Sequence, residues 1–432
     1  MTNAFVARGE LLHCPAHPAA VGDDPPVEHV PDGYLLVRDG IIESSGDWRG
    51  RDDANFSDLP VHDYRGQLLV PGFIDCHIHY AQTDVMGAHG TELLEWLQRY
   101  TFPAESRFSD LESAAECAYF FIDELLRNGT TTALVFATTH EHSADAIFEA
   151  AAKKNLLLGA GKVLMDRNCP QNLRDDPDTA YEASHRLIER WHNRGRLQYA
   201  ITPRFAPTSS EQQLARAGEL AAAFPDCYVH THLAENHDEI AWVKTLFPGA
   251  RSYLDVYERF GLLRQRSVFA HCIHLDHDDR ERLRATRASI AFCPTSNLFL
   301  GSGLFDWQAA GGIRTGLATD VGGGTSFNML QTAAEAYKVI KMTGQTLSPA
   351  STLYLLTLGG AKALDLDRKI GNFLPGKEAD FLVINREATP LLSRRMQKTE
   401  DIFEQWFALM MLADDRVIQT TFVDGRKVYA RD

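Results

Sequence analysis

The chain has no excess of positive charge and no long apolar run. Its 432 residues include 43 basic and 58 acidic ones, for a net charge of −15. Such a charge repels polyanions, so we expect neither a nucleic-acid polymer nor an anionic membrane as a partner. No apolar stretch approaches the ~20 residues of a membrane span, and no charged-then-apolar leader opens the sequence. These absences predict a cytoplasmic protein.

Cysteine is scarce, and no Cys-X-X-Cys pair occurs. The odd total of seven cysteines argues against a disulfide framework and for a reducing compartment. Low-complexity segments and repeats of fixed period are absent as well. What is present is an ordinary globular composition, 44% hydrophobic and 23% charged, in a chain long enough to build its core without disulfides.

Both ends of the chain read as short strands and turns. The segments with this pattern are 34–43, 377–384 and 420–429. The first turns at Asp39-Gly40, a dipeptide typical of two-residue hairpin loops, and the last contains another Asp-Gly. No helix of useful length is expected before residue 66. We therefore predict one small β-sandwich domain built from residues 1–66 and 372–432.

The middle of the chain, residues 67–371, alternates apolar strands with helices. One expected helix, 114–128, ends before Gly129, a typical helix stop. The eight expected strands are the stretch within 71–80, then 131–136, 156–165, 197–203, 227–232, 267–271, 289–293 and 314–320. Strands and helices that alternate eight times over this length predict an α/β fold, a (β/α)₈ TIM-like barrel.

The first of these strands ends in two histidines, His77 and His79. Residues two apart share a face on a strand, whereas on a helix they diverge by roughly 200°. A His-X-His pair that grips one metal ion therefore needs a strand, and the apolar run 68–70 with Phe73 and Ile74 favours one. From this pair alone, two histidines in a polar loop remain an equal alternative.

Polar side chains recur where later strands are expected to end. They are Arg204, His230, His232, Glu235, His271 and Asp320. The carboxyl ends of barrel strands meet at one mouth, where active sites form. Ionisable groups in such positions are costly to bury unless they are paired or bound to metal. The pattern predicts a metal site or an active site at this mouth.

These motifs resemble the amidohydrolase superfamily. They include Pro-Gly-Phe-Ile-Asp-Cys-His-Ile-His at 71–79, the lone histidines at later strand ends and Ala-Thr-Asp at 318–320. Longer matches are similar to the guanine deaminases within it: 91–105, 201–209, 229–236, 292–298 and 371–380. The resemblance spans nearly the whole chain, except the first thirty or so residues and the segment around 390–405.

The resemblance implies hydrolysis of guanine to xanthine and ammonia, with a small purine as the partner and a homodimer as the expected assembly. An alternative is a deaminase or dechlorinase of another aminated purine, pyrimidine or triazine. A non-catalytic scaffold of the same fold has no reason to retain the full set of polar strand ends. The unrelated zinc deaminases with Pro-Cys-X-X-Cys are excluded, since that motif is absent.

Carried over residue by residue, the resemblance makes His77, His79, His232 and Asp320 the metal ligands. Three neutral imidazoles and one carboxylate suit one Zn²⁺ with an open position for water, and Fe²⁺ accepts the same donors. Spacing alone does not choose between His230 and His232. The family selects His232, which leaves His230 behind it as a hydrogen-bonded neighbour. Lys162 is the one nearby candidate for a lysine that bridges two metals.

The resemblance also assigns the reacting and substrate-binding groups. Glu235 becomes the proton shuttle, although a carboxylate there also suits a helix start. His271 would hydrogen-bond the attacking water, and Asp320 would orient it and take its proton. The substrate-binding residues are then Gln82, Arg204, Phe205, His232, Glu235 and Asp320. A helix over 91–100 would line the mouth or simply pack on the barrel.

Overall fold

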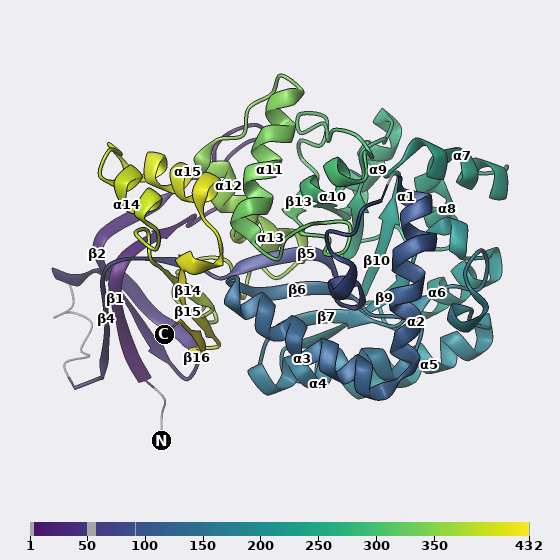
Figure 1. The fold of residues 1–432 in the computed structure, drawn as a ribbon, viewed down its shortest axis with the longest axis horizontal. Coiled ribbons are helices and arrows are strands. Elements are labelled where there is room, and N and C mark those ends of the chain that lie inside the picture. The colour runs from purple at the N-terminus through teal and green to yellow at the C-terminus, as the bar shows by residue number, and fades with distance from the viewer. Residues whose placement is uncertain (1–3, 50–57, 91, 432) are drawn as a thin grey trace.

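Strands from both ends of the chain join one sheet, as the sequence predicts. The computed structural model describes residues 4–49, 58–90 and 92–431. In these residues the terminal sheet has the order β16-β15-β14-β4-β1-β2-β3 and carries both termini (Figure 1). Its strands are β1 (Ala4–His13), β2 (Glu28–Arg38), β3 (Ile41–Asp47), β4 (Val61–Pro71), β14 (Phe381–Ile384), β15 (Ile418–Val423) and β16 (Arg426–Ala430).

This sheet curls over its own face. Phe5 on β1 and Phe422 on β15 stack with ring centroids 5.8 Å apart, although three strand steps separate them. Neighbouring strands stand ~4.8 Å apart, so a flat sheet would hold these rings roughly 14 Å apart. The curl encloses a second small core that includes Leu35, Val37 and Phe381. The predicted sandwich is therefore one folded sheet.

The chain passes from the terminal sheet to the barrel at Gly72, a few residues after the expected boundary. The run 68–70, expected to lead into the His-X-His strand, belongs to β4 and pairs antiparallel with β14. The barrel strand starts separately at Phe73. A Cβ at Gly72 would collide with the Thr131 hydroxyl, so only glycine allows the crossing.

The barrel strands are parallel and run in the order β13-β12-β11-β10-β9-β7-β6-β5, with β8 beside β9. They are β5 (Phe73–His79), β6 (Thr130–Phe136), β7 (Leu157–Gly161), β8 (Val163–Leu164), β9 (Leu197–Pro203), β10 (Tyr228–Leu233), β11 (Ser267–His271), β12 (Ser289–Phe292) and β13 (Arg314–Leu317). The ring closes beyond β13, where the Asp320 backbone N–H donates to the His77 carbonyl oxygen at 3.0 Å. The predicted (β/α)₈ fold is confirmed.

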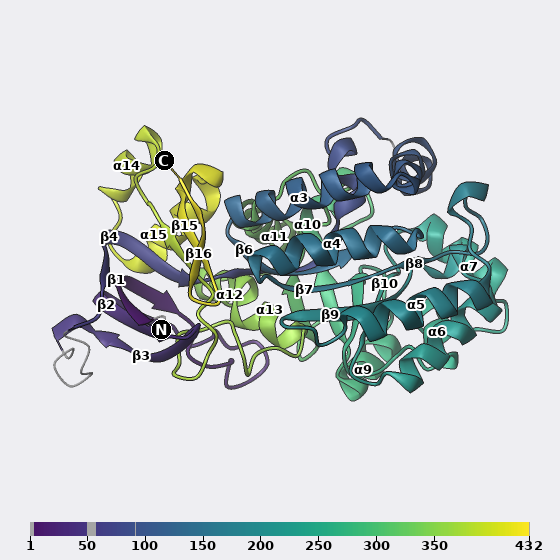
Figure 2. The same ribbon diagram turned by 90° about the horizontal axis from the view of Figure 1, so that it is seen from below.

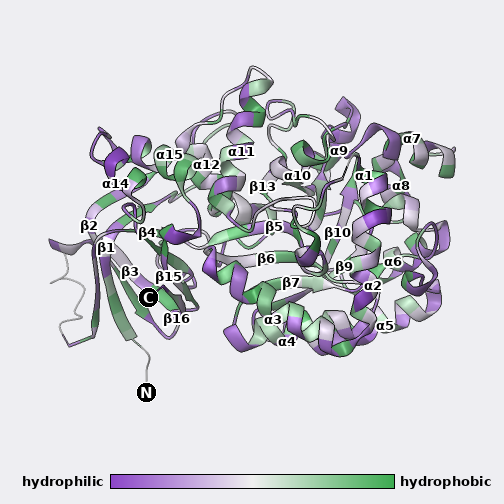
Figure 3. Ribbon diagram, in the orientation of Figure 1, coloured by the Kyte–Doolittle hydropathy of each residue, from purple (hydrophilic) through white to green (hydrophobic). Residues whose placement is uncertain are grey.

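Helices cover the outside of the barrel (Figure 2). They are α3 (Leu111–Arg127), α4 (Glu141–Lys154), α5 (Pro177–Trp191), α6 (Glu211–Ala223), α7 (His237–Leu246), α8 (Tyr253–Arg259), α9 (His277–Thr286), α10 (Pro294–Phe299), α11 (Met329–Met342), α12 (Pro349–Leu356) and α13 (Leu358–Ala363); α14 (Pro390–Met396) and α15 (Ile402–Leu412) follow β14. The outer helices are banded green and purple in Figure 3, as helices with one buried face should be. No described helix is long and apolar enough to cross a bilayer.

The helix α3 shows how local signals set these boundaries. It begins three residues before the predicted 114–128, because the Asp110 carboxylate accepts a hydrogen bond from the Ser113 backbone N–H at 2.8 Å and caps the first turn. It ends before Gly129, which has φ +81°. The predicted stop at that glycine is confirmed.

The segment after β5 is not one regular helix. Of the predicted 91–100, residue 91 lies outside the described residues. From residue 93 the chain forms α1 (Leu93–Trp96) and a π-helical turn (Leu97–Thr101), and α2 (Phe102–Ser106) follows beyond the predicted end. A π turn widens the helix and shifts the side chains that follow it, and such turns gather at functional sites. Here the turn lies above the barrel mouth.

Candidate active site

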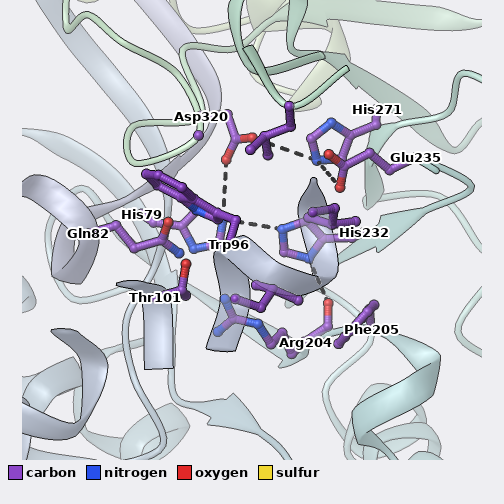
Figure 4. Close-up of a pocket in the computed structure, with 14 residues that line it drawn as sticks. His79, Gln82, Trp96, Thr101, Arg204, Phe205, His232, Glu235, His271 and Asp320 are labelled. Atoms are coloured by element: carbon purple, nitrogen blue, oxygen red, sulfur yellow. Dashed lines mark hydrogen bonds and ion pairs between the residues drawn. The ribbon is translucent and has the colours of Figure 1, made fainter. Parts of the chain in front are cut away.

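A pocket opens at the mouth of the barrel, where the polar strand ends meet (Figure 4). It is lined by His79, Gln82, Leu93, Trp96, Leu97, Thr101, Arg204, Phe205, His232, Glu235, His271, Leu300, Asp320 and Gly323. The segment 93–101 forms its outer wall, so of the two expected roles this segment lines the mouth. Every predicted substrate-binding residue is in this lining.

The four predicted metal ligands converge at the floor of the pocket. His79 Nε2 lies 3.1 Å from His77 Nε2 and 3.2 Å from His232 Nε2. Asp320 Oδ1 lies 3.2 Å from His77 Nε2 and 3.3 Å from His79 Nε2. Four ligand atoms held about 2.1 Å from one zinc ion in a tetrahedron stand roughly 3.4 Å apart. The donor set therefore fits a single metal ion.

The protonation of these groups suits a metal as well. Removal from water lowers the pKa of His79 to about 3 and that of His232 well below the ordinary value, so both imidazoles are neutral. Burial opposes ionisation of Asp320, but hydrogen bonds from His77 and His79 hold its pKa well below the usual range. Neutral imidazole and ionised carboxylate are the forms that bind divalent metals.

Outer hydrogen bonds aim the imidazoles at this point. His232 donates its Nδ1–H to the Arg204 carbonyl oxygen at 2.7 Å, which leaves the Nε2 lone pair free. His77 Nδ1 lies 2.7 Å from His230 Nε2. His230 is thus a hydrogen-bonded neighbour, as expected, and its partner is His77. Such partners fix the tautomer and orientation of a ligating histidine.

Backbone strain is concentrated at this mouth. Ala234, His271, Cys272 and Asp320 all have positive φ, between 49° and 69°. Residues other than glycine adopt this region at a cost of ~1–3 kcal/mol each, and they persist where the surrounding structure imposes them. The surrounding structure therefore fixes the backbone at the ends of β11 and β13 and in the turn before Glu235.

Glu235 is a buried carboxyl group that faces the ligand cluster. Its Oε1 accepts a hydrogen bond from Ser302 Oγ at 2.9 Å, and its Oε2 lies 3.4 Å from His271 Nε2. Burial, and then the negative charge of Asp320, raise the pKa of Glu235 to about 8. A carboxyl group in this state holds a proton at neutral pH and can give it up.

A second buried carboxylate holds the turn that carries Glu235. Glu239 accepts from the Glu235 backbone N–H at 3.0 Å and from Tyr253 OH at 2.7 Å. It also belongs to the capping box that starts α7 at Asn236. The alternative view of Glu235 as the helix-start carboxylate therefore fits Glu239 instead.

His271 is fixed by a neighbour that the sequence analysis did not single out. Its Nδ1 lies 2.8 Å from Asn297 Oδ1, so it carries the proton and donates it. The other nitrogen, Nε2, faces both Glu235 and Asp320, 3.7 Å from Asp320 Oδ2. Asn297 stands on α10, within the motif 292–298, but its distance from His271 in sequence hid the pair.

Arg204 is already paired with a carboxylate that sequence reasoning missed. Its Nη1 donates to both oxygens of Glu105 at 2.7 Å each, and both side chains are buried. Gln82 Nε2 donates to the same carboxylate at 3.3 Å. Glu105 closes the motif 91–105, and its place in that motif was the available signal.

Two further polar residues escaped the sequence analysis. Thr101, in the π-helical turn, is fully buried, and its hydroxyl has no hydrogen-bond partner among the described residues. Asp75, on β5, accepts from the backbone N–H groups of Thr319 at 3.1 Å and His77 at 3.2 Å. Asp75 thereby ties β5 to the segment that carries Asp320.

Lys162 stands apart from the ligand cluster. Its Nζ donates to Asp175 Oδ2 at 2.6 Å and to the Val163 carbonyl oxygen at 3.2 Å. The ammonium group is thus engaged in a buried ion pair, away from the four ligands. This arrangement supports a site for one metal and not a bridged pair.

Comparisons with known proteins agree with this geometry. The amidohydrolase family profile matches residues 68–428. Guanine deaminase of Escherichia coli K12 is 54% identical over 407 residues, covering 93% of this chain and 92% of that protein. Its solved structure superposes with a TM-score of 0.94 at 50% identity, with full coverage of both chains. A Clostridium acetobutylicum guanine deaminase, crystallised with guanine in its active site, gives 0.90 at 30% identity, covering 99% of this chain and 100% of that one. This chain therefore belongs to the amidohydrolase family and, within it, to the guanine deaminases.

Proposed function

We propose that this chain hydrolyses guanine to xanthine and ammonia at the pocket described above, with one divalent metal ion, expected to be zinc. The observation that carries the proposal is the convergence of four metal-binding side chains on the floor of a pocket that Glu235 and Arg204 also line. The relative from Clostridium acetobutylicum, whose active site holds guanine, supports the choice of purine.

His77, His79, His232 and Asp320 would hold the metal. A bound zinc ion supplies a water molecule whose pKa is lowered towards ~7. Asp320 would accept a proton from this water as the water oxygen bonds to C2 of guanine. Glu235 gives its proton to the neighbouring ring nitrogen. The amino group then leaves as ammonia with the proton that Asp320 returns, and Glu235 regains a proton from the new oxygen at C2.

His271 orients the attacking water during these proton transfers. Asn297 accepts from its Nδ1–H, so its Nε2 is presented to the space between Glu235 and Asp320. With Nδ1–H engaged by Asn297, Nε2 is the atom placed to accept a hydrogen bond from the attacking water. It thereby orients the water oxygen towards C2 while Asp320 and Glu235 each transfer a proton to or from the reactants.

The direct test is a steady-state assay of the metal-loaded protein with guanine, adenine, cytosine and an aminated triazine. We expect turnover of guanine, with adenine and cytosine poor or inert. Efficient turnover of a triazine or of adenine, with guanine inert, would favour the alternative substrates and contradict the proposal.

The specificity should depend on Arg204. Guanine offers a carbonyl and an imidazole nitrogen as acceptors, whereas adenine places an amino donor where that carbonyl stands. A site built from hydrogen bonds rejects a mispaired substrate by as much as ~10⁴–10⁵-fold. We expect Arg204→Ala to lower kcat/KM for guanine at least ~10²-fold, since charged hydrogen bonds are worth ~1.5–3 kcal/mol each. Arg204→Lys should rescue little, because lysine lacks the planar fork. Guanine turnover by Arg204→Ala at the wild-type rate would count against this role.

Thr101 offers a smaller test of the same pocket. Its buried hydroxyl has no partner among the described residues and lines the pocket, so we expect it to hydrogen-bond the substrate. Thr101→Val should raise KM for guanine roughly 2–10-fold, the effect of one neutral hydrogen bond. Thr130→Val is the matched control, because that hydroxyl is also buried and without a partner, but it lies on β6 outside the pocket lining. An equal KM in both variants would show that Thr101 only packs.

A further inference from the structure

The two polar side chains expected to bind the purine are joined through a third residue. Glu105 stands on α2 in the segment above the barrel mouth, while Gln82 follows β5 and Arg204 follows β9. The Glu105 carboxylate accepts from Arg204 Nη1 at 2.7 Å through each oxygen and from Gln82 Nε2 at 3.3 Å. All three side chains are buried. One carboxylate thus links side chains that follow two different barrel strands.

This link leaves defined groups of Arg204 and Gln82 for a ligand. Among the described residues, Arg204 donates hydrogen bonds through Nη1, and its Nε and Nη2 make none. The Gln82 amide is oriented as well, because a carboxylate accepts only and must meet its NH₂ group. Gln82 Oε1 then points away from Glu105 and lies against Gly322. A Cβ at Gly322, where φ is +104°, would collide with that oxygen.

The outcome is a fixed pattern of donors and acceptors. Arg204 presents N–H donors to the ligand, and Gln82 presents a carbonyl acceptor. An amide free to rotate could present either its donor or its acceptor and would accept either pattern on a base. When Glu105 holds the amide, the Gln82 carbonyl oxygen faces the ligand and requires a ring N–H donor on the base. Guanine carries an N–H beside its carbonyl group, whereas adenine carries an amino donor beside a bare ring nitrogen.

We propose that Glu105 is a positioning residue that sets the substrate selectivity of this pocket by orienting both Arg204 and Gln82. It touches neither the reacting atoms nor the metal ligands and acts through these two side chains. The inference rests on the proposed function and deepens it, because it assigns the discrimination between purines to a residue outside the reacting set.

The test compares Glu105→Gln with the wild type on guanine and adenine, together with metal content and Tm. Glutamine keeps the size of the side chain, but its NH₂ group cannot accept from Arg204, and it removes the charge that orients both partners. We expect kcat/KM for guanine to fall at least ~10-fold, mainly through KM, as for a lost charge-assisted hydrogen bond. The ratio of kcat/KM for guanine to that for adenine should decrease by a similar factor, and the metal content should stay unchanged.

Asp380→Asn is the matched control. It removes the carboxylate of another buried ion pair, which joins Asp380, just before β14, to Arg196, just before β9, and neither residue lines the pocket. Both variants should have a lower Tm than the wild type, but only Glu105→Gln should change KM for guanine and the selectivity for guanine over adenine. If Glu105→Gln lowers Tm as the control does and keeps the wild-type selectivity, the residue is structural and the inference is overturned.

A second variant covers the case in which Glu105→Gln does not fold. Glu105→Asp keeps the charge but is one methylene shorter, so it cannot hold both partners at their present distances. We expect it to fold and to show a smaller loss of selectivity in the same direction. Wild-type selectivity in Glu105→Asp would overturn the inference. A wild-type protein that does not deaminate guanine would instead overturn the proposed function itself, which separates the two failures.

Discussion

Replacing His232 with alanine will remove most of the bound divalent ion and lower kcat for guanine at least ~10³-fold. The imidazole Nε2 of His232 lies 3.2 Å from that of His79 and supplies one of four converging ligand atoms. Without the metal, the water that attacks C2 returns from a pKa near ~7 towards 15.7, which removes the nucleophile at neutral pH. Elemental analysis and a steady-state guanine assay on the same preparation measure both effects.

The matched control is His277→Ala, since His277 is exposed at the start of α9. It should keep both the ion and the activity. The wild-type protein should bind about one ion per chain, because Lys162 is occupied by Asp175. Two tightly bound ions per chain would contradict the single-metal site, and a metal-free protein with full activity would contradict the site altogether.

Glu235→Gln should lower kcat for guanine by ~10²–10⁴-fold, the usual contribution of a general acid–base group. Glutamine preserves the shape of the side chain and can still accept from Ser302, but it has no proton to exchange. Burial raises the pKa of Glu235 to about 8, so the group that is lost is one poised to donate near neutrality. Metal content should stay at the wild-type level, because Glu235 is not among the four ligands.

The exposed Glu112→Gln on α3 is the control for loss of a carboxylate and should leave kcat unchanged. Glu239→Gln separates proton transfer from support of the turn. It should lower stability, because Glu239 accepts from the Glu235 backbone and from Tyr253. Activity of Glu235→Gln within a few-fold of the wild type would mean that this carboxyl group does not move the proton.

The local pattern of the chain predicts most of the fold. Strand and helix periods are properties of short windows, so the alternation over 67–371 and the stop at Gly129 could be predicted from residues close together in sequence. The Asp-Gly turns of the terminal hairpins are local in the same way: Asp39 and Asp424 have positive φ as such turns require. Element boundaries also depend on partners far away in sequence: the run 68–70 belongs to the terminal sheet because it pairs with β14, which no local window shows.

The sequence by itself placed His77, His79 and Asp320 at the ends of expected strands, which share one mouth in a parallel barrel. The choice of His232 over His230 came from the family resemblance. Only the tertiary structure decided what surrounds these side chains. Glu105 meets Arg204 across 99 residues, and Asn297 meets His271 across 26. Thr101 lies in a π turn and lines the pocket, which no local pattern had indicated. The physical reason is that a strand end has one direction in every barrel, whereas loops between strands are placed by packing and by the need to pair buried charges.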